Sequence, residues 1–454
     1  MEGNKVQNFL RKYMMLIIMV LVIIAFAIIT GGKTLIPQNI NNVISQNGYV
    51  FVLGTGMLLC ILTGGNIDLS VGSTVCLAGG VGAIMLEKGM PWPIAVITMI
   101  IFGILIGMWN GFWIAYVNVP PFIATLVGWM AFRGIANLIM GGMAYTISDS
   151  QFLMIFGGGD KCYVTDLLQS IGLPTPAPTD LAPIKATIEF QKFLPAALAK
   201  RIPNLVIDIK GGPSDTICLW AGAIIALGYV AFVIINRVRL IQKKYKVDSL
   251  VSVIVKTVLI ALVILGLSNL LARHNGIPTV LIWIALVLGI FAYITTKTTL
   301  GRNLYAVGGN EKATRLSGID TKKVMFKAYT LMGLLAGFAG ILNIARFVGS
   351  QPTYGQGYEM DAIAACFIGG ASAYGGTGSV GGVIIGAALM GIINQGMVVA
   401  NTPANYQTVV KGIVLVLAVF FDVLMQMRRK GSKKKKAKDT EIPVTESVEG
   451  GAEA

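Results

Sequence analysis

Long apolar runs alternate with short polar segments along the whole chain. Twelve runs of 13 to 25 residues cover 13–30, 48–63, 71–87, 93–117, 120–140, 216–236, 249–271, 278–296, 326–345, 359–371, 380–399 and 406–426. An α-helix needs about 20 mostly apolar residues to cross a bilayer. The pattern therefore predicts an all-α polytopic membrane protein with about 10–12 transmembrane helices. The run at 359–371 is too short to cross unaided, which predicts a re-entrant half-helix.

Composition supports this assignment, and the charge pattern gives the chain an orientation. Hydrophobic residues make up 55% of the 454 residues and charged residues 13%, whereas about a quarter of a soluble protein is charged. The segments 1–12, 237–248, 297–327 and 428–454 hold 23 of the 36 Lys and Arg, within a net charge of +15. Basic clusters beside apolar runs are typical of cytoplasmic loops. We therefore expect both termini to be cytoplasmic, the basic tail to touch membrane lipid, and no nucleic acid to bind.

The same pattern divides the chain into six parts. They are an N-terminal membrane half with five spans at 1–140, an extracytoplasmic loop at 141–215, three further spans with a basic cytoplasmic loop at 216–296, a cytoplasmic segment at 297–327, a C-terminal membrane half at 328–427 and a disordered cytoplasmic tail at 428–454. Cys162 lies in the external part, so we expect it to react with an impermeant thiol reagent. Ala25-Phe26-Ala27 could end a cleaved leader, but the run is long for a leader and more spans follow.

One polar segment, Thr299–Asp320, carries its own helix signal. It combines a capping residue, an acid in the first turn, a base in the last turn and a left-handed stop, which are Asn310, Glu311, Arg315 and Gly318. Ala313 and Leu316 lie three apart on one face. A helix of roughly eight residues is marginal alone in water, which favours a helix that rests on a partner. The alternative is a capped surface turn between two spans.

Two pairs of polar residues interrupt apolar stretches. Asp68 and Ser70 follow Gly64-Gly65 in a stretch of otherwise apolar residues, and an acid near the membrane is a candidate functional group. The alternative is that one of them caps the next helix. Asn394 and Gln395 lie inside the run 380–399, where they could line a translocation path or join neighbouring helices. All four are predicted path residues.

Glycine is abundant and recurs at helical spacing. There are 55 Gly, with GxxxG at Gly103–Gly107, Gly107–Gly111, Gly333–Gly337 and Gly382–Gly386. Such motifs let helix backbones approach closely in membranes. They indicate tight packing within the chain or a dimer interface.

The residues do not indicate an enzyme, a metal site or a bound cofactor. The five Cys form no CxxC motif, and His274 is the single His, which disfavours metal and His-based catalytic sites. Ala27–Thr34 (AIITGGKT) resembles a loosened P-loop, but it ends an apolar run instead of following a strand. Any ATP must therefore be hydrolysed by another subunit.

Several motifs resemble one family. GRNLYAVGGNEKATRLSGI, IDLSVGS, PFIATL, QPTYGQGYEMDAIAA and GGTGSVGG are similar to the permease subunits of ABC importers for ribose, xylose and galactose. The resemblance covers roughly 15–148 and 278–425. The segment 150–270 is longer than in the ribose type and is more like the xylose or multiple-monosaccharide branch, so we expect it to be an addition to the transport core.

The resemblance implies a function and partners. The chain would be a non-catalytic permease in a bacterial cytoplasmic membrane, working as a homodimer with a cytoplasmic ATP-binding subunit and an extracytoplasmic sugar-binding protein that delivers a monosaccharide. The implied ATPase-coupling residues are Gly301, Arg302, Asn303, Gly308, Gly309, Asn310, Glu311, Ala313, Arg315, Leu316 and Gly318. The rival class is a self-sufficient secondary transporter or channel, which would need buried ionisable groups for coupling.

Overall fold

The computed structural model describes residues 2–188, 205–245 and 249–438. Most of them are helical. The helices are α1 (Glu2–Ile29), η1 (Lys33–Leu35), α2 (Pro37–Gln46), α3 (Gly48–Leu62), α4 (Val71–Glu87), α5 (Trp92–Ala115), α6 (Pro121–Met140), α7 (Ser150–Phe156), α8 (Val164–Ser170), α10 (Thr216–Gln242), α11 (Leu250–Ala272), α12 (Thr279–Lys297), α13 (Thr299–Gly309), α14 (Glu311–Leu316), α15 (Thr321–Arg346), α16 (Tyr358–Ile368), α17 (Val380–Val399) and α18 (Ala404–Lys438).

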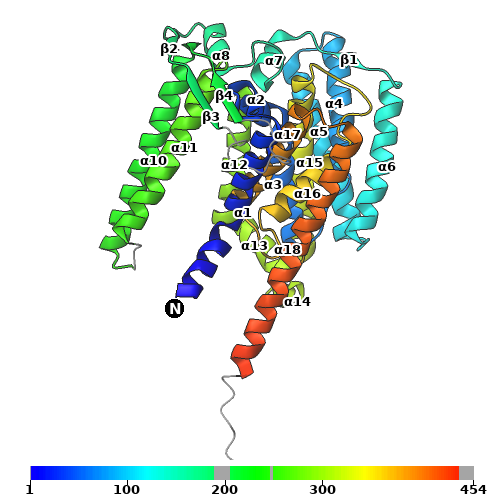
Figure 1. The fold of residues 1–454 in the computed structure, drawn as a ribbon. Coiled ribbons are helices and arrows are strands. Elements are labelled where there is room, and N and C mark those ends of the chain that lie inside the picture. The colour runs from blue at the N-terminus through cyan, green and yellow to red at the C-terminus, as the bar shows by residue number, and fades with distance from the viewer. Residues whose placement is uncertain (1, 189–204, 246–248, 439–454) are drawn as a thin grey trace, which may run out of the picture.

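Six short strands form three antiparallel pairs. They are β1 (Tyr145–Thr146) with β6 (Gly349–Ser350), β2 (Thr179–Leu181) with β5 (Gly212–Ser214), and β3 (Ile184–Ile188) with β4 (Leu205–Ile209). The strands lie with α7 and α8 at one end of the molecule, opposite the end that carries α14 (Figure 1).

The helices confirm the all-α polytopic fold class. Among the described residues, seven helices are long and apolar enough to cross a membrane, and α2 with α3 would form an eighth span bent by 40°. Met15–Ile29, α4 and Ala404–Phe420 are shorter apolar helices. The half-helix expected at 359–371 is α16, with 11 residues. The pattern of apolar runs does not predict helix α2, because its sequence, PQNINNVISQ, is largely polar.

Helix α15 is the centre of the bundle, where it packs against α3, α4 and α5. The GxxxG motifs of α5 and α15 face each other, since Gly103 and Gly107 lie against the backbone of Gly333 and Gly337. These motifs therefore pack helices within one chain. The motif of α17 does the same against α16, where Gly382 meets the Gly369 carbonyl.

Helices α10 and α11 form a hairpin at the side of the bundle (Figure 1). They pack mainly on each other, and α11 also contacts α2. Cys218, Leu271 and Ala272 form a small apolar cluster that is separate from the main core. The hairpin is therefore a peripheral element.

Three expectations need correction. Cys162 is buried, with 6% of its surface exposed, and burial raises the pKa of its thiol, so it is a poor target for a thiol reagent. Phe152 and Phe156 belong to the main core, so the segment 150–270 does not lie wholly outside the transport core. Residues 428–438, expected to be disordered, continue α18, because Lys and Ala favour a helix that the span has already nucleated; residues 439–454 lie outside the described residues.

Candidate functional site

The polar segment after α12 folds into two short helices. Asn310 caps α14 by accepting a hydrogen bond from the Ala313 N–H at 3.0 Å, and Gly318 follows the helix with φ +81°. The predicted cap and left-handed stop are confirmed. Helix α13, which precedes α14 and is capped by Thr298, was not predicted, because its glycines disfavour a helix on propensity alone.

Helix α14 has one face turned toward the bundle and one turned away. Thr314 is buried, and Arg315 donates to Glu311 at 3.3 Å and to the Thr321 hydroxyl at 3.5 Å. Ala313 and Leu316 lie on the exposed side, and 90% of the Leu316 surface is exposed. The helix thus presents an apolar side chain at its tip with nothing described in this chain to cover it.

Helix α13 connects α14 to the transport core. Gly308 lies against the Leu62 carbonyl at the end of α3 and against Gly376 in the loop after α16. The Tyr305 hydroxyl donates to the Gly378 carbonyl in the same loop at 2.8 Å. Gly301 packs against the carbonyls at the end of α12, whereas Arg302 and Gly309 are exposed and Asn303 is half-buried. Movement of α13 would therefore be transmitted directly to α3 and to the loop between α16 and α17.

The pair Asp68 and Ser70 is buried together before α4. Asp68 Oδ1 accepts hydrogen bonds from the Ser70 N–H at 2.9 Å and from its hydroxyl at 2.7 Å. Asn110 of α5 donates to the Ser70 hydroxyl at 2.8 Å. The Ser70 side chain does not cap α4. Asp68 instead stabilises the backbone that leads into α4 through its hydrogen bonds with Ser70. This role is close to the helix-capping alternative.

The pair on α17 points to different neighbours. Asn394 donates to Asn47 Oδ1 at 3.1 Å and to Asp361 Oδ2 at 3.4 Å, and Gln395 donates to Asn39 Oδ1 at 3.1 Å. Both side chains therefore join neighbouring helices. This is compatible with either interpretation, because residues that line a path also need partners when it is closed.

The sequence analysis missed a buried ion pair next to Asn394. Asp361 of α16 is fully buried, and its Oδ2 accepts from Lys411 Nζ at 2.9 Å and from the Tyr49 hydroxyl at 2.6 Å. Lys411 comes from α18 and Tyr49 from α3. The signal in the sequence is an acid inside the run 359–371 and a base inside the run 406–426.

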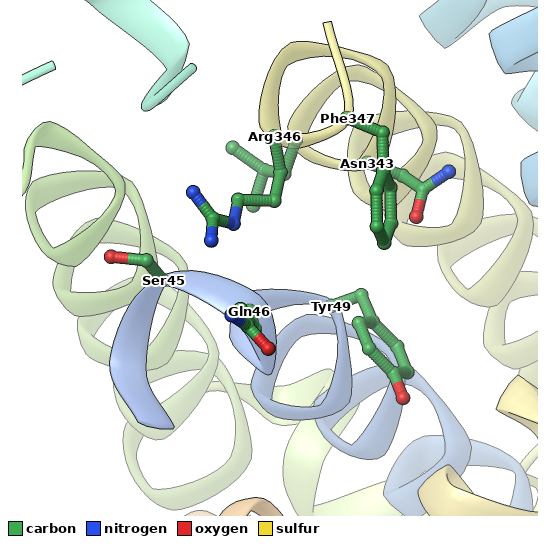
Figure 2. Close-up of a pocket in the computed structure, with 8 residues that line it drawn as sticks. Ser45, Gln46, Tyr49, Asn343, Arg346 and Phe347 are labelled. Atoms are coloured by element: carbon green, nitrogen blue, oxygen red, sulfur yellow. The ribbon is translucent and has the colours of Figure 1, made fainter. Parts of the chain in front are cut away.

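A small cavity, lined in part by Tyr49, lies between the start of α3 and the end of α15 (Figure 2). Its lining residues are Ser45, Gln46, Gly48, Tyr49, Leu342, Asn343, Arg346 and Phe347. The Tyr49 ring stacks on Tyr358 with the ring centroids 3.6 Å apart, and the Tyr358 hydroxyl donates to Asn343 at 2.7 Å. Tyr49 therefore lines the cavity, and its hydroxyl contacts Asp361.

Over residues 2–188, 205–245 and 249–438, no group of three or more His, Cys, Asp and Glu is arranged to hold a metal ion.

A bundle of spans with a half-helix and two short helices beyond its end is an arrangement suited to a permease. The sequence matches the family described as branched-chain amino acid transport system / permease component, over residues 39–164 and 196–419. The chain belongs to this family.

Named relatives are similar over nearly their whole length. The xylose transport system permease protein XylH of Haemophilus influenzae is 34% identical over 91% of this chain and 96% of its own, and that of Escherichia coli K12 is 32% identical over 94% and 95%. The ribose import permease protein RbsC of Escherichia coli K12 is 29% identical over 89% of this chain and 92% of its own. No solved structure gives a significant match.

Proposed function

We propose that this chain is the membrane-spanning permease subunit of an ATP-driven importer for a monosaccharide. It works as a homodimer with a cytoplasmic ATPase and receives the sugar from an external binding protein. The similarity to permeases named for xylose and ribose over about nine-tenths of the chain supports the substrate class. The greater similarity to the xylose permeases makes a pentose such as xylose the first sugar to test.

The observation that carries the proposal is the exposed face of α14. A six-residue helix is too short to be stable by itself, yet its cap and its Glu311–Arg315 pair hold it in shape. Leu316 is 90% exposed at the tip of this helix. An apolar side chain presented on a braced helix suits a groove on a partner. The partner is the ATPase, and α13 passes its movement to α3 and to the loop after α16.

The rival function is a self-sufficient secondary transporter, and the Asp361–Lys411 pair is the observation that favours it. Ion-coupled transporters use buried ionisable groups of this kind. However, the two charges neutralise each other at 2.9 Å, and a coupling ion would have to displace one of them. A permease driven by ATP needs no such exchange.

Reconstitution separates the two functions. Purified permease in proteoliposomes should not accumulate xylose or ribose under a proton or sodium gradient. Addition of the ATPase, ATP and the sugar-loaded binding protein should start uptake. Gradient-driven uptake by the permease alone would overturn the proposal.

A further inference from the structure

The Asp361–Lys411 pair is surrounded by polar groups from four elements. Asp361 lies in the first turn of α16, Lys411 on α18, Tyr49 on α3 and Asn394 on α17. All three neighbours donate to the same carboxylate oxygen, Oδ2, at distances from 2.6 to 3.4 Å. The half-helix therefore starts at a convergence of helices.

The other carboxylate oxygen has no partner. Asp361 Oδ1 is buried without a hydrogen bond among the described residues, and so is Oδ1 of Asn394, whose Nδ2 lies 3.4 Å from Asp361 Oδ2. Buried acceptors are nearly always paired, and those that are not call for an explanation. Two unpaired acceptors on residues that contact each other, next to an ion pair, are not what stability requires, because an ion pair in an apolar interior can often be replaced by apolar residues without loss. They are suited to a ligand that brings hydroxyl donors.

The surroundings indicate how such a ligand would reach the two oxygens. The Tyr49 ring lines the cavity between α3 and α15 (Figure 2), and its hydroxyl rests on Asp361. The Tyr49 ring also stacks on Tyr358, with the ring centroids 3.6 Å apart. Lys411 retains 24% side-chain exposure, so the pair is not sealed on every side. An aromatic ring next to free acceptors suits a sugar, which has apolar C–H faces and hydroxyl edges.

We propose that Asp361 Oδ1 and Asn394 Oδ1 accept hydrogen bonds from hydroxyl groups of the translocated sugar, next to the Tyr49–Tyr358 stack. This rests on the proposed function and adds a substrate-contacting site to it. Lys411 orients the carboxylate, because it holds Oδ2 and leaves Oδ1 free for the sugar. The site binds neutral polyhydroxy compounds.

Asp361→Asn is a direct test. The Lys411 ammonium can only donate hydrogen bonds, so the oxygen of the new amide should stay on its side, which places an NH2 donor where Oδ1 now lies. The acceptor at the sugar site becomes a donor. The complete importer, with the same ATPase and binding protein in every sample, is reconstituted, and uptake is measured for ribose, xylose and their 2- and 3-deoxy analogues.

We expect Asp361→Asn to lower uptake of the parent sugar by about tenfold or more, since a hydrogen bond to a charged acceptor is lost. Uptake of the deoxy analogue that lacks the contacted hydroxyl should fall far less. The ratio of parent to that analogue would then change, and because the binding protein is constant, the change would come from the permease. An equal fall for every sugar, or no fall, would overturn the inference by giving the pair a structural role.

Two further variants complete the test. Asn394→Ala removes the second acceptor and leaves the ion pair intact. If Asp361→Asn fails to reach the membrane, the ratio of parent-sugar uptake to deoxy-analogue uptake in Asn394→Ala tests the inference instead. Gln407→Met is a matched control, because Gln407 lies one turn before Lys411 on α18 and donates to the Thr402 carbonyl at 2.8 Å; its ratios should equal those of the unaltered chain. If the unaltered importer moves no sugar, the proposed function itself fails, which is a different result from unchanged ratios.

Discussion

At the scale of single residues, the absence of a side chain sets how closely the central helices approach. A Cβ atom added to Gly333 would lie 2.6 Å from the Cα of Gly107, and one added to Gly337 would lie 2.7 Å from the Met99 carbonyl oxygen. Both neighbours are backbone atoms, which cannot move aside as a flexible side chain can. In a membrane such close backbone packing replaces the hydrophobic effect as a source of helix association.

Gly333→Ala should therefore destabilise the bundle, by about 1–3 kcal/mol as for other overpacked sites. The matched control is Gly289→Ala on α12, where an added Cβ meets nothing within 4 Å; it should be neutral or slightly stabilising, because Ala favours a helix over Gly. Thermal unfolding midpoints of the two variants in detergent measure the difference. Equal midpoints would contradict the close packing of α5 on α15.

At the scale of elements, the short helix α14 has both a well-fixed local structure and an exposed apolar face. Arg315 is tied to Glu311 and Thr321, so it helps to hold α14 against the start of α15. Asp320 caps α15, and its hydrogen bond from the Lys323 N–H lowers the pKa of the carboxyl group, which keeps it charged. These charged groups therefore hold α14 in place, and its outer face stays free to contact a partner.

Ala313→Trp should abolish sugar uptake while the permease still reaches the membrane. The added ring would overpack a close contact, at a typical cost of about 1–3 kcal/mol, or roughly five- to over a hundredfold in affinity. Arg315→Ala should be milder, because an exposed pair contributes under about 1 kcal/mol. Co-purification of the ATPase and uptake in cells measure both effects.

Ala177→Trp, at an exposed position near the opposite end of the molecule, controls for the bulk of the Trp side chain. It should leave ATPase binding unchanged. Normal ATPase recovery and uptake with Ala313→Trp would mean that α14 is not the docking site.

Local signals predicted α14 well and predicted its neighbours poorly, for a physical reason. The cap, charges and glycine of α14 are all within nine residues, so the sequence contains the whole signal. Helix α13 depends on Gly308 fitting against Leu62 and Gly376, and the Asp361 site depends on α3, α16, α17 and α18 meeting. Such contacts join distant parts of the chain, and no local pattern records them.

At the scale of the whole molecule, the basic segments lie at one end. The N-terminal end of α1, helix α14 and the C-terminal end of α18 point the same way, and α7, α8 and the strands lie at the other end (Figure 1). The arrangement agrees with the charge pattern of the sequence, because cytoplasmic segments are rich in Lys and Arg. The end that carries α14 is therefore the proposed cytoplasmic side.

Cysteine labelling tests this orientation. All five native Cys are buried, so they should give little background. Leu173→Cys, at a half-exposed position between α8 and β2, should react with an impermeant thiol reagent in intact cells. Lys312→Cys, on α14, should react only after the membrane is opened. The reverse pattern would overturn the orientation.

The α10–α11 hairpin should be removable as a unit. Its ends meet, since the Asp215 N–H donates to the Ala272 carbonyl at 2.9 Å, and a short glycine linker can replace 216–271. None of the most apolar 18-residue stretch of α11 is buried in this chain, so little core packing is lost. We expect this variant to fold and to keep uptake.

Removal of α10 alone, residues 216–242, should behave differently. It leaves an odd number of spans, which should invert every span after it and make Lys312→Cys reactive from outside. Loss of folding and uptake to the same degree in both deletions would make the hairpin part of the transport core. A functional chain without the hairpin would instead show that the spans before α10 and after α11 form the transport unit by themselves.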